Sequence, residues 1–247
     1  MRVARLLSIV LIGSAAAALL AAGSSRSAPA VLTHAPPAFL VGHSASLNWA
    51  GYSSFGSTFT DVKGSWTQPS AACSNKTTYS SFWVGLDGYN SGSVEQLGTE
   101  ADCAHGSPRY YAWWEMFPNP SNTIARFTVT PGTTYTGEVK YNGNGSFTLT
   151  LSGGGQSFST TQTLANPSLS SAEWIAEAPS MCAGSCRVLP LTNFGTVNFS
   201  GSSANAKAIN AWSFDPLTMV TSGGQVKAQQ SGLDPTGSAF SVAWKHS

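Results

Sequence analysis

Hydrophobic and polar residues alternate with a period of two along most of the chain beyond residue 45. One such run covers residues 135–141 and a second covers residues 147–151. Between them stands Asn-Gly-Asn-Gly at 142–145, which is the composition of a hairpin turn. A run of glycines at 153–155 offers a further turn. Because the side chains of a strand point alternately to its two faces, this pattern predicts strands with one buried face.

Shorter stretches continue the pattern at residues 125–129, 209–211 and 240–244, and we expect strands there as well. Beyond the N-terminal apolar stretch, no window of helical length holds a clean period of 3.6 residues. Gly, Pro and Asn punctuate the strands, and neither an internal repeat nor a linker divides the chain. The pattern therefore predicts an all-β fold, an antiparallel two-sheet β-sandwich that forms a single domain.

The N-terminus has the make-up of an export signal. Arg2 and Arg5 precede an apolar stretch at 6–20, which is too short for a confident membrane span, and small residues follow. We therefore expect residues 1–28 to be a signal peptide and the mature protein to be secreted and extracellular. Residues 29–45 are rich in Ala, Pro and Ser and lack an apolar period, so they are either a short propeptide or a disordered lead-in. Residues 46–247 then form the β-sandwich domain.

Charged residues are scarce, at 9% of the chain, with 12 Lys and Arg against 11 Asp and Glu. Without Arg2, Arg5 and Arg26 the balance is 9 against 11, a net charge near −2. This leaves no basic patch for a nucleic acid and no polybasic anchor for a membrane, and we expect a monomer with neither partner. Because charged residues are scarce, the chain has few ion pairs to lose when carboxylates are protonated at low pH. The composition therefore suits an acidic medium.

The chain has four cysteines, and an even number in an exported protein favours disulfide bonds. Of the possible pairings we favour Cys73 with Cys103, which would brace the segment that carries Gln96, and Cys182 with Cys186, which closes a tight loop. A zinc site is disfavoured because the spacing is wrong and histidine is lacking. We therefore expect no metal and no cofactor.

The positions of the four histidines disfavour histidine chemistry. His34 and His43 belong to the lead-in, His246 is the penultimate residue, and His105 stands in a stretch typical of an exposed loop. A serine triad needs a buried, oriented histidine, so none is expected. Bridged cysteines would leave no thiol nucleophile, and no glycine loop leads from a strand into a helix to hold a phosphate.

Carboxylates beside tryptophans are the remaining chemical signal, because packing against aromatic rings raises the pKa of a carboxyl group. In a strand over residues 172–178, Glu173 and Glu177 share one face. An isolated pair with this spacing is more often a solvated face, but the chain has few Glu residues and two stand here. Glu115 follows Trp113 on its strand face, so it either lines an aromatic cleft or is a structural acid near the strand end.

Four segments, in order along the chain, resemble the eqolisins, the family of glutamic peptidases. They read Asn-Trp-Ala-Gly at 48–51, Trp-Val-Gly-Leu-Asp-Gly at 83–88 followed by Gln96, Tyr-Ala-Trp-Trp-Glu at 111–115, and Ala-Glu-Trp-Ile at 172–175. The resemblance covers most of residues 46–244. It implies a sandwich of two large, bent antiparallel sheets of concanavalin-like type, in agreement with the alternation.

The resemblance implies that Glu173 and Gln96 are the catalytic pair of an acid endopeptidase acting on polypeptides without a cofactor. Glu173 would be the general base for an attacking water and then the general acid for the leaving amine. The Gln96 amide would donate a hydrogen bond to the oxyanion. The remaining family positions would orient this pair or line the substrate cleft: Trp83, Asp87, Trp113 and Glu115.

Three departures from the familiar fungal pattern suggest a bacterial branch. The loop at 88–95 lacks a cysteine, Tyr111 replaces an acidic residue, and Ala-Pro follows Glu177 in place of an acidic pair. If the register of Glu173 were different, Glu177 would be the base. Two other functions stay open: a glycoside hydrolase that uses Glu115 and Glu173, and a non-catalytic carbohydrate-binding or adhesion module. An amide facing Glu173 would favour peptide hydrolysis, and a second carboxyl group would favour sugar hydrolysis.

Overall fold

The computed structural model describes residues 30–41, 44–183 and 185–247, and the predicted signal peptide lies outside them. Strands make up nearly all of the regular structure, with one short 3-10 helix in the described part of the chain. Among these residues no helix has the length and apolar composition needed to cross a membrane. The predicted all-β fold is confirmed.

The strands follow one another along the whole described chain, and most are separated by short loops. In chain order they are β1 (Val31–Thr33), β2 (Phe39–Val41), β3 (Ala45–Ser46), β4 (Trp49–Phe55), β5 (Asp61–Thr67), β6 (Ser81–Leu86), β7 (Val94–Ala104), β8 (Ser107–Phe117), β9 (Asn122–Thr123), β10 (Thr134–Gly143), β11 (Ser146–Gly153), β12 (Gln156–Thr163), β13 (Ser171–Glu177), β14 (Ser180–Cys182), β15 (Cys186–Val188), β16 (Thr196–Ala204), β17 (Lys207–Ala208), β18 (Ser213–Val220), β19 (Val226–Gln230) and β20 (Phe240–Trp244); the 3-10 helix η1 is Ile209–Ala211.

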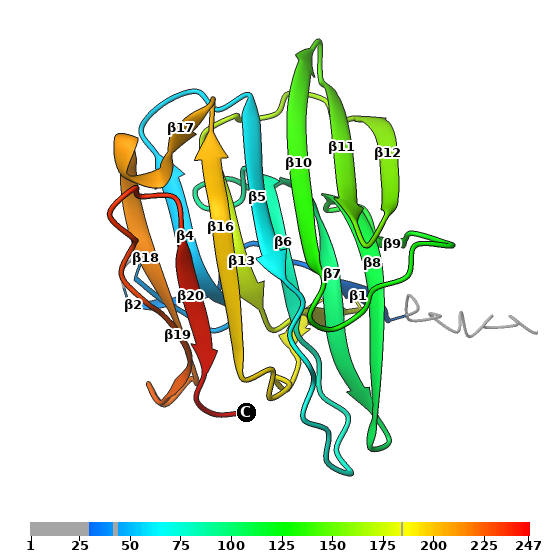
Figure 1. The fold of residues 1–247 in the computed structure, drawn as a ribbon. Helices are drawn as coiled ribbons and strands as arrows, with labels where there is room; N and C mark the ends of the chain where they lie inside the picture. Colours follow the sequence, from blue (N-terminus) through cyan, green and yellow to red (C-terminus); the bar gives the residue numbers. More distant parts are fainter. Residues whose placement is uncertain (1–29, 42–43, 184) are drawn as a thin grey trace, which may run out of the picture.

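Two large antiparallel sheets form the two layers of the sandwich (Figure 1). The first, which we call the site sheet, has the strand order β18–β4–β13–β6–β7–β8–β9. The second, the outer sheet, has the order β12–β11–β10–β5–β16–β20–β19 and then returns to β18. Strand β18 pairs in both sheets and joins the layers along one edge. The predicted antiparallel two-sheet sandwich is therefore confirmed.

The core between the sheets follows from the alternation of side chains. In β10, Tyr135 and Val139 are fully buried, whereas Lys140 is exposed. The turn from β10 to β11 consists of Asn144 and Gly145, whose positive φ angles of 54° and 73° are those of the tight hairpin that the sequence predicted. Long runs with a period of two thus predict strands correctly here, because each of these strands presents one face to the core.

Both predicted disulfides form, Cys73 with Cys103 and Cys182 with Cys186. Cys103 lies in β7, so the first bond ties the loop after β5 to the strand that carries Gln96. The second closes the β14–β15 hairpin. His105 is exposed in the turn between β7 and β8, as predicted.

Two predicted strands are wrong. Residues 125–129 form a loop, although Phe127 and Val129 are buried. Residues 209–211 form η1, in which only Ile209 is buried. Alternation over three to five residues does not distinguish a strand from an irregular segment that inserts one or two side chains into the core.

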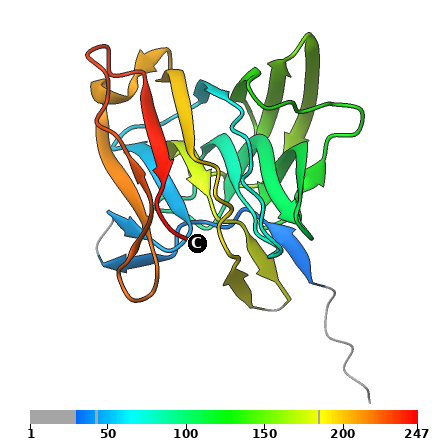
Figure 2. The ribbon, with the colours of Figure 1, turned by 60° about the horizontal axis from the view of Figure 1, so that its bottom comes forward.

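The stretch 30–41, from here on the N-terminal segment, is part of the folded molecule. β1 pairs with β14, and β2 pairs with β3, which itself runs parallel to β18. In Figure 2 this segment, in blue, runs past the olive β14–β15 hairpin and along the lower side of the molecule. The described residues of 29–45 therefore do not form a disordered lead-in. Their role as a propeptide stays a prediction.

Candidate active site

Glu173, Gly85 and Gln96 stand side by side on neighbouring strands of the site sheet. Glu173 of β13 pairs with Gly85 of β6, and Gly85 pairs with Gln96 of β7. Residues paired in this way project from the same face, here the one turned away from the core, which we call the site face. With strands about 4.8 Å apart, the Cα atoms of Glu173 and Gln96 are roughly 9–10 Å apart.

The glycine between this pair leaves room for the side chains beside it. A Cβ atom at Gly85 would lie 3.0 Å from the Trp83 ring and 3.1 Å from the Gln96 Cβ. Distances this short would force the neighbours to shift. The absence of a side chain at Gly85 therefore lets the Trp83 ring and Gln96 pack closely against this strand.

Tryptophans occupy the next row on the same face. Trp83 pairs with Gly98, and Gly98 pairs with Trp113. Each indole N–H has a buried acceptor: Trp83 Nε1 donates to Glu177 Oε2 at 2.8 Å, and Trp113 Nε1 donates to Ser81 Oγ at 3.0 Å. These hydrogen bonds fix the two rings, which form an aromatic wall beside the Glu173–Gln96 row.

The site face gathers most of the acidic residues of this weakly charged chain. Strand alternation and register place six of the 11 Asp and Glu residues there: Glu100, Asp102, Glu115, Glu173, Glu177 and Asp215. All of them except Asp215 are buried. An ionised carboxylate without a partner costs several kcal/mol to bury. The face therefore favours protons, hydrogen-bond donors or a cation.

Glu173 is fully buried, and its Oε1 accepts a hydrogen bond from Ser53 Oγ at 3.1 Å. Burial raises the pKa of Glu173 well above its ordinary range, and the charges of Asp87 and Glu95 raise it further, whereas the hydroxyl groups of Ser171 and Ser53 lower it. A carboxyl group in such surroundings is typical of an acid–base catalyst. The solvated-face interpretation of Glu173 and Glu177 is wrong, because both are buried.

Glu177 lies on the far side of the tryptophan row. It pairs with Trp49 and Ser81, so it stands four residues away from the row that holds Gln96. Burial raises its pKa well above the ordinary range, and the charge of Glu115 adds to the rise. Its distance from the Gln96 row makes Glu173 the better placed base of the two.

Asp87 connects the end of β6 to the start of β13. Its carboxylate accepts backbone N–H hydrogen bonds from Leu169 and Ser170, each at 2.7 Å, and its own N–H donates to Ser171 O at 3.0 Å. Its backbone has a positive φ of 65°, which is uncommon outside glycine and asparagine-like positions. Asp87 therefore positions the strand that carries Glu173.

Both hydrogens of the Gln96 amide are already engaged. Nε2 donates to the backbone carbonyl of His34 at 2.7 Å and to Glu115 Oε2 at 3.1 Å. Both neighbours are acceptors, so the nitrogen of the amide must face them. The group that the resemblance assigns to the oxyanion thus binds a peptide carbonyl in this structure.

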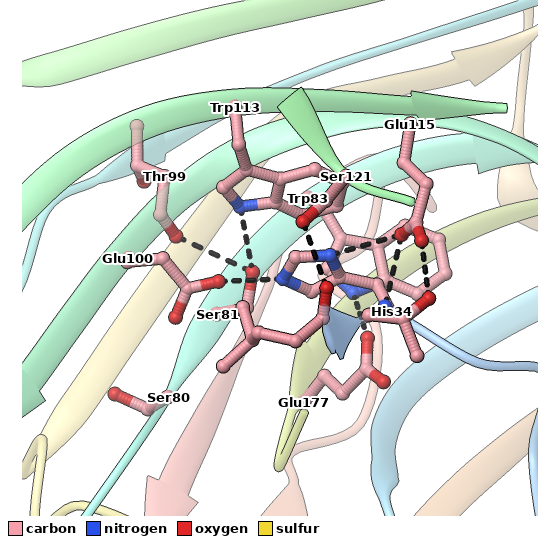
Figure 3. A network of polar contacts seen from close by, with 12 residues as sticks. His34, Ser80, Ser81, Trp83, Thr99, Glu100, Trp113, Glu115, Ser121 and Glu177 are labelled. Carbon is pink, nitrogen blue, oxygen red and sulfur yellow. Dashed lines mark hydrogen bonds and ion pairs between the residues drawn. The ribbon is translucent and has the colours of Figure 1, made fainter. Parts of the chain in front are cut away.

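His34 of the N-terminal segment lies on the site face between two carboxylates (Figure 3). Its ring stacks on Trp113 with 3.4 Å between centroids, Nε2 is 2.6 Å from Glu100 Oε1, and Nδ1 is 3.0 Å from Glu115 Oε2. Burial lowers the pKa of His34, but hydrogen bonds to Glu100 and Glu115 and their charges outweigh it and raise the pKa to about 9. His34 is therefore held as a cation.

Glu100 and Asp102 form an acidic pair next to His34. Burial raises the pKa of Glu100 well above its ordinary range, with the charge of Asp102 adding to it and His34 opposing it. Burial also raises the pKa of Asp102, to about 6. Tyr111 donates its hydroxyl to Asp102 Oδ2 at 3.1 Å, so the tyrosine that departs from the family pattern contacts an acid on the adjacent strand.

A hollow of about 160 Å³ opens at the Glu173 end of the site face. Its lining residues are Phe55, Tyr89, Asn90 and Asp215. Asp215 pairs with Ser53, the residue that donates to Glu173, and it accepts a hydrogen bond from the Tyr89 hydroxyl. The described residues include no group of three or more His, Cys, Asp or Glu side chains suited to a metal ion.

The structure brings five of the predicted site residues to one face, Trp83, Gln96, Trp113, Glu115 and Glu173, and Asp87 follows the end of β6. Sequence reasoning missed His34, Ser53, Glu100 and Asp102. Glu100 and Asp102 could have been found by counting in twos from Gln96 along its strand. His34 has no such signal, because its segment shows no hydrophobic period from which a strand face could be predicted.

The antiparallel sandwich thus places a buried carboxyl group and an amide in one row, beside tryptophans. The model of the peptidase A4 family matches residues 47–239, so the chain belongs to this family, the eqolisins. The protein is accordingly of the peptidase class, as the resemblance implied. No curated protein matches the chain significantly.

Solved structures of glutamic peptidases share the fold. Scytalido-glutamic peptidase with a transition state analog inhibitor has a TM-score of 0.69 at 23% identity, over 80% of this chain and 98% of that one. SCP-B, an eqolisin in complex with the tripeptide Ala-Ile-His, has 0.67 at 22% identity, over 80% and 98%. Aspergilloglutamic peptidase from Aspergillus niger has 0.57 at 21% identity, over 68% and 99%.

Proposed function

We propose that this chain is an acid endopeptidase in which Glu173 activates water and Gln96 stabilises the oxyanion. The observation that carries the proposal is the row Glu173–Gly85–Gln96 on the site face. It offers a titratable group and a fixed hydrogen-bond donor on either side of a residue that has no side chain. Membership in a peptidase family supplies the substrate class.

In the proposed reaction, ionised Glu173 takes a proton from a water molecule as the water oxygen bonds to the peptide carbonyl carbon. The carbonyl electrons move to the oxygen, and the Gln96 Nε2–H donates to the resulting oxyanion. Glu173 then gives its proton to the amide nitrogen, and the C–N bond breaks. The oxyanion electrons re-form the carbonyl as the C–N bond breaks, the proton leaves with the amine, and Glu173 ends ionised and ready for the next turnover.

The raised pKa of Glu173 suits the second half of this sequence, because a weaker acid holds the transferred proton until the amine leaves. The first half requires the ionised form. Entry of water and a polar substrate would hydrate Glu173 and bring its pKa down from the value that full burial imposes. The pKa of the hydrated Glu173 then sets the lower limit of the acidic pH range in which cleavage is expected.

The hypothesis of a glycoside hydrolase is disfavoured by the register. Glu115 is separated from Glu173 by two intervening strands, which puts the two backbones roughly 14 Å apart at the usual strand spacing. The residue that faces Glu173 across Gly85 is an amide, and Glu115 is engaged by Gln96.

Polypeptide ligands agree with the names of the fold relatives, one with a transition state analog inhibitor and one with a tripeptide. Export, function in an acidic medium and independence from cofactors stay part of the proposal. The signal that would direct export lies outside the described residues.

The proposal is tested by incubating the full chain with a denatured protein from about pH 2 to about pH 7, beside Glu173→Gln, which should lower the rate by about 10²–10⁴-fold. Glu138→Gln, on β10 of the outer sheet, is the matched control and should cleave like the parent. Acid-dependent cleavage by the parent and the control alone supports Glu173 as the acid and base. Cleavage by all three proteins moves the role to Glu177 or Glu115. Cleavage by none favours the glycan-binding hypothesis.

A further inference from the structure

The N-terminal segment lies on the site face as a bound peptide would. The His34 carbonyl accepts from Gln96 at 2.7 Å, and the His34 backbone N–H donates to Glu115 Oε2 at 2.9 Å. The Thr33 hydroxyl also donates to Glu115. Main-chain groups on both sides of the His34 α-carbon are thus held by two residues of the proposed site.

Asn48 binds the next part of the segment. Its Nδ2 donates to the carbonyls of Ala35 at 3.1 Å and Pro36 at 3.2 Å, and its Oδ1 accepts from the Ala38 N–H at 2.9 Å. Asn48 belongs to the first of the family motifs, directly before β4. Main-chain contacts of this kind do not depend on the side chains of the ligand, so they hold any peptide of similar course.

The His34 side chain fills a pocket with a distinct chemistry. Trp113 provides a flat aromatic wall, and Glu100 and Glu115 reach the two ring nitrogens from opposite sides. Both ring nitrogens face carboxyl oxygens, an arrangement that a protonated ring satisfies by donating from both nitrogens. A cation over an indole face and between carboxylates is favoured by charge, by hydrogen bonding and by cation–π attraction.

Without a cation this pocket would hold carboxyl groups that burial penalises. Glu100 and Glu115 are fully buried, and Asp102 is nearly so. In the N-terminal segment the charge comes from the side chain of the same residue whose carbonyl binds Gln96. The pocket therefore binds the side chain of the residue whose own carbonyl accepts the hydrogen bond from Gln96.

We propose that the pocket of Trp113, Glu100 and Glu115 is a substrate subsite for a basic side chain, and that the N-terminal segment is its intramolecular ligand. The inference rests on the proposed peptidase function and extends it in two ways. The preferred substrates carry Lys, Arg or His at the residue whose carbonyl reaches Gln96. The segment competes with them for the same site.

The first experiment compares the full chain with His34→Ala on two peptides that differ only in having Lys or Gln at one position. His34→Ala removes the side chain that occupies the pocket, so the KM for the Lys peptide should fall by about 30-fold or more, the scale of a lost buried charge pair. His105→Ala, in an exposed turn, is the matched control and should leave KM unchanged. A KM for His34→Ala equal to that of the parent would overturn the competition.

Glu100→Gln tests the subsite itself and does not depend on His34→Ala folding. The full chain should prefer the Lys peptide over the Gln peptide by about tenfold or more in kcat/KM, and Glu100→Gln should bring this ratio close to one. Glu138→Gln, on β10 of the outer sheet, is the matched control and should keep the parent ratio. Equal kcat/KM values for the two peptides in the parent would overturn the basic subsite.

A binding measurement separates this inference from the proposed function. A synthetic peptide with the sequence of residues 30–41 is titrated into His34→Ala in a calorimeter, beside the same peptide with Ala in place of His34. The second peptide should bind about 30-fold more weakly. If binding follows this pattern while no variant cleaves any peptide, the subsite stands and the peptidase mechanism fails. If both peptides bind equally, the subsite is overturned.

Discussion

In β6, β7 and β13 both faces of the site sheet are buried, but the two faces are built from different kinds of residue. The core face carries apolar side chains that pack against the outer sheet, among them Val84, Leu97 and Trp174. The site face carries carboxyl groups, an amide and indole rings, and the N-terminal segment covers part of it. Strands β6, β7 and β13 are therefore buried on both sides, with a pattern of burial that does not reveal which side is the core.

The difference shows that burial has opposite energetic signs on the two faces. Apolar burial on the core face contributes about 25 cal/mol per Å² to stability. Buried carboxyl groups on the site face cost free energy unless they are protonated, hydrogen-bonded or paired with a cation. The residues of the site face are thus expected to matter for activity more than for stability, and those of the core face the reverse.

Two adjacent residues of β7 that point to opposite faces give the most direct test of whether activity and stability are separated between the faces. Gln96→Ala, on the site face, removes the proposed oxyanion donor. It should lower kcat by about 10²–10³-fold while the protein stays folded. Kinetics on a denatured protein substrate, with circular dichroism of the same samples, measures both effects. Near-normal turnover would remove Gln96 from the mechanism.

Leu97→Ala, the next residue along, should do the reverse. Leu97 is fully buried in the main core, so its truncation is expected to lower the free energy of unfolding by about 2–5 kcal/mol. Molecules that remain folded should keep the parent kcat. Urea denaturation curves beside active-site-normalised rates provide the measurement. A loss of kcat with unchanged stability would show that the two faces are not separable in this way.

The pH dependence of stability sharpens the comparison further, because the buried acids have raised pKa values in the folded state. Burial and the charge of Asp87 raise the pKa of Glu95 from 4.5 to about 9, and burial raises that of Asp102 to about 6. A raised pKa means that the folded state binds protons more tightly than the unfolded state. The resulting stability is complete below about pH 4 and is lost as the pH rises to about 9.

We therefore expect the melting temperature to be highest in acid and to fall towards pH 9. Each strongly shifted carboxyl group should lower the free energy of unfolding by at least about 1 kcal/mol over this range. Protonated His34 acts in the same direction, because its pKa of about 9 lies above the ordinary 6.5. Calorimetry on Glu173→Gln, which avoids self-digestion, measures the slope. Leu97→Ala should shift the whole curve without changing the slope. A stability maximum at alkaline pH would contradict the assignment.

Strand positions were predictable where the pattern was long. The hairpin at residues 135–151 could be predicted because alternation and turn chemistry are local properties of the chain. The strands expected at 125–129 and 209–211 failed because their patterns were too short to separate a strand from a buried loop. The acidic strand face beyond Gln96 was also predictable in principle, since Glu100 follows at an even spacing.

The sequence by itself determined the sandwich, the disulfides and, through four ordered motifs, the candidate pair Glu173 and Gln96. Only the tertiary structure decided which residues share a row, because cross-strand register joins positions far apart in the chain. It alone placed His34 between Glu100 and Glu115. A segment without periodicity is held in its position by the surface that it contacts, and that surface exists only once the distant strands have assembled.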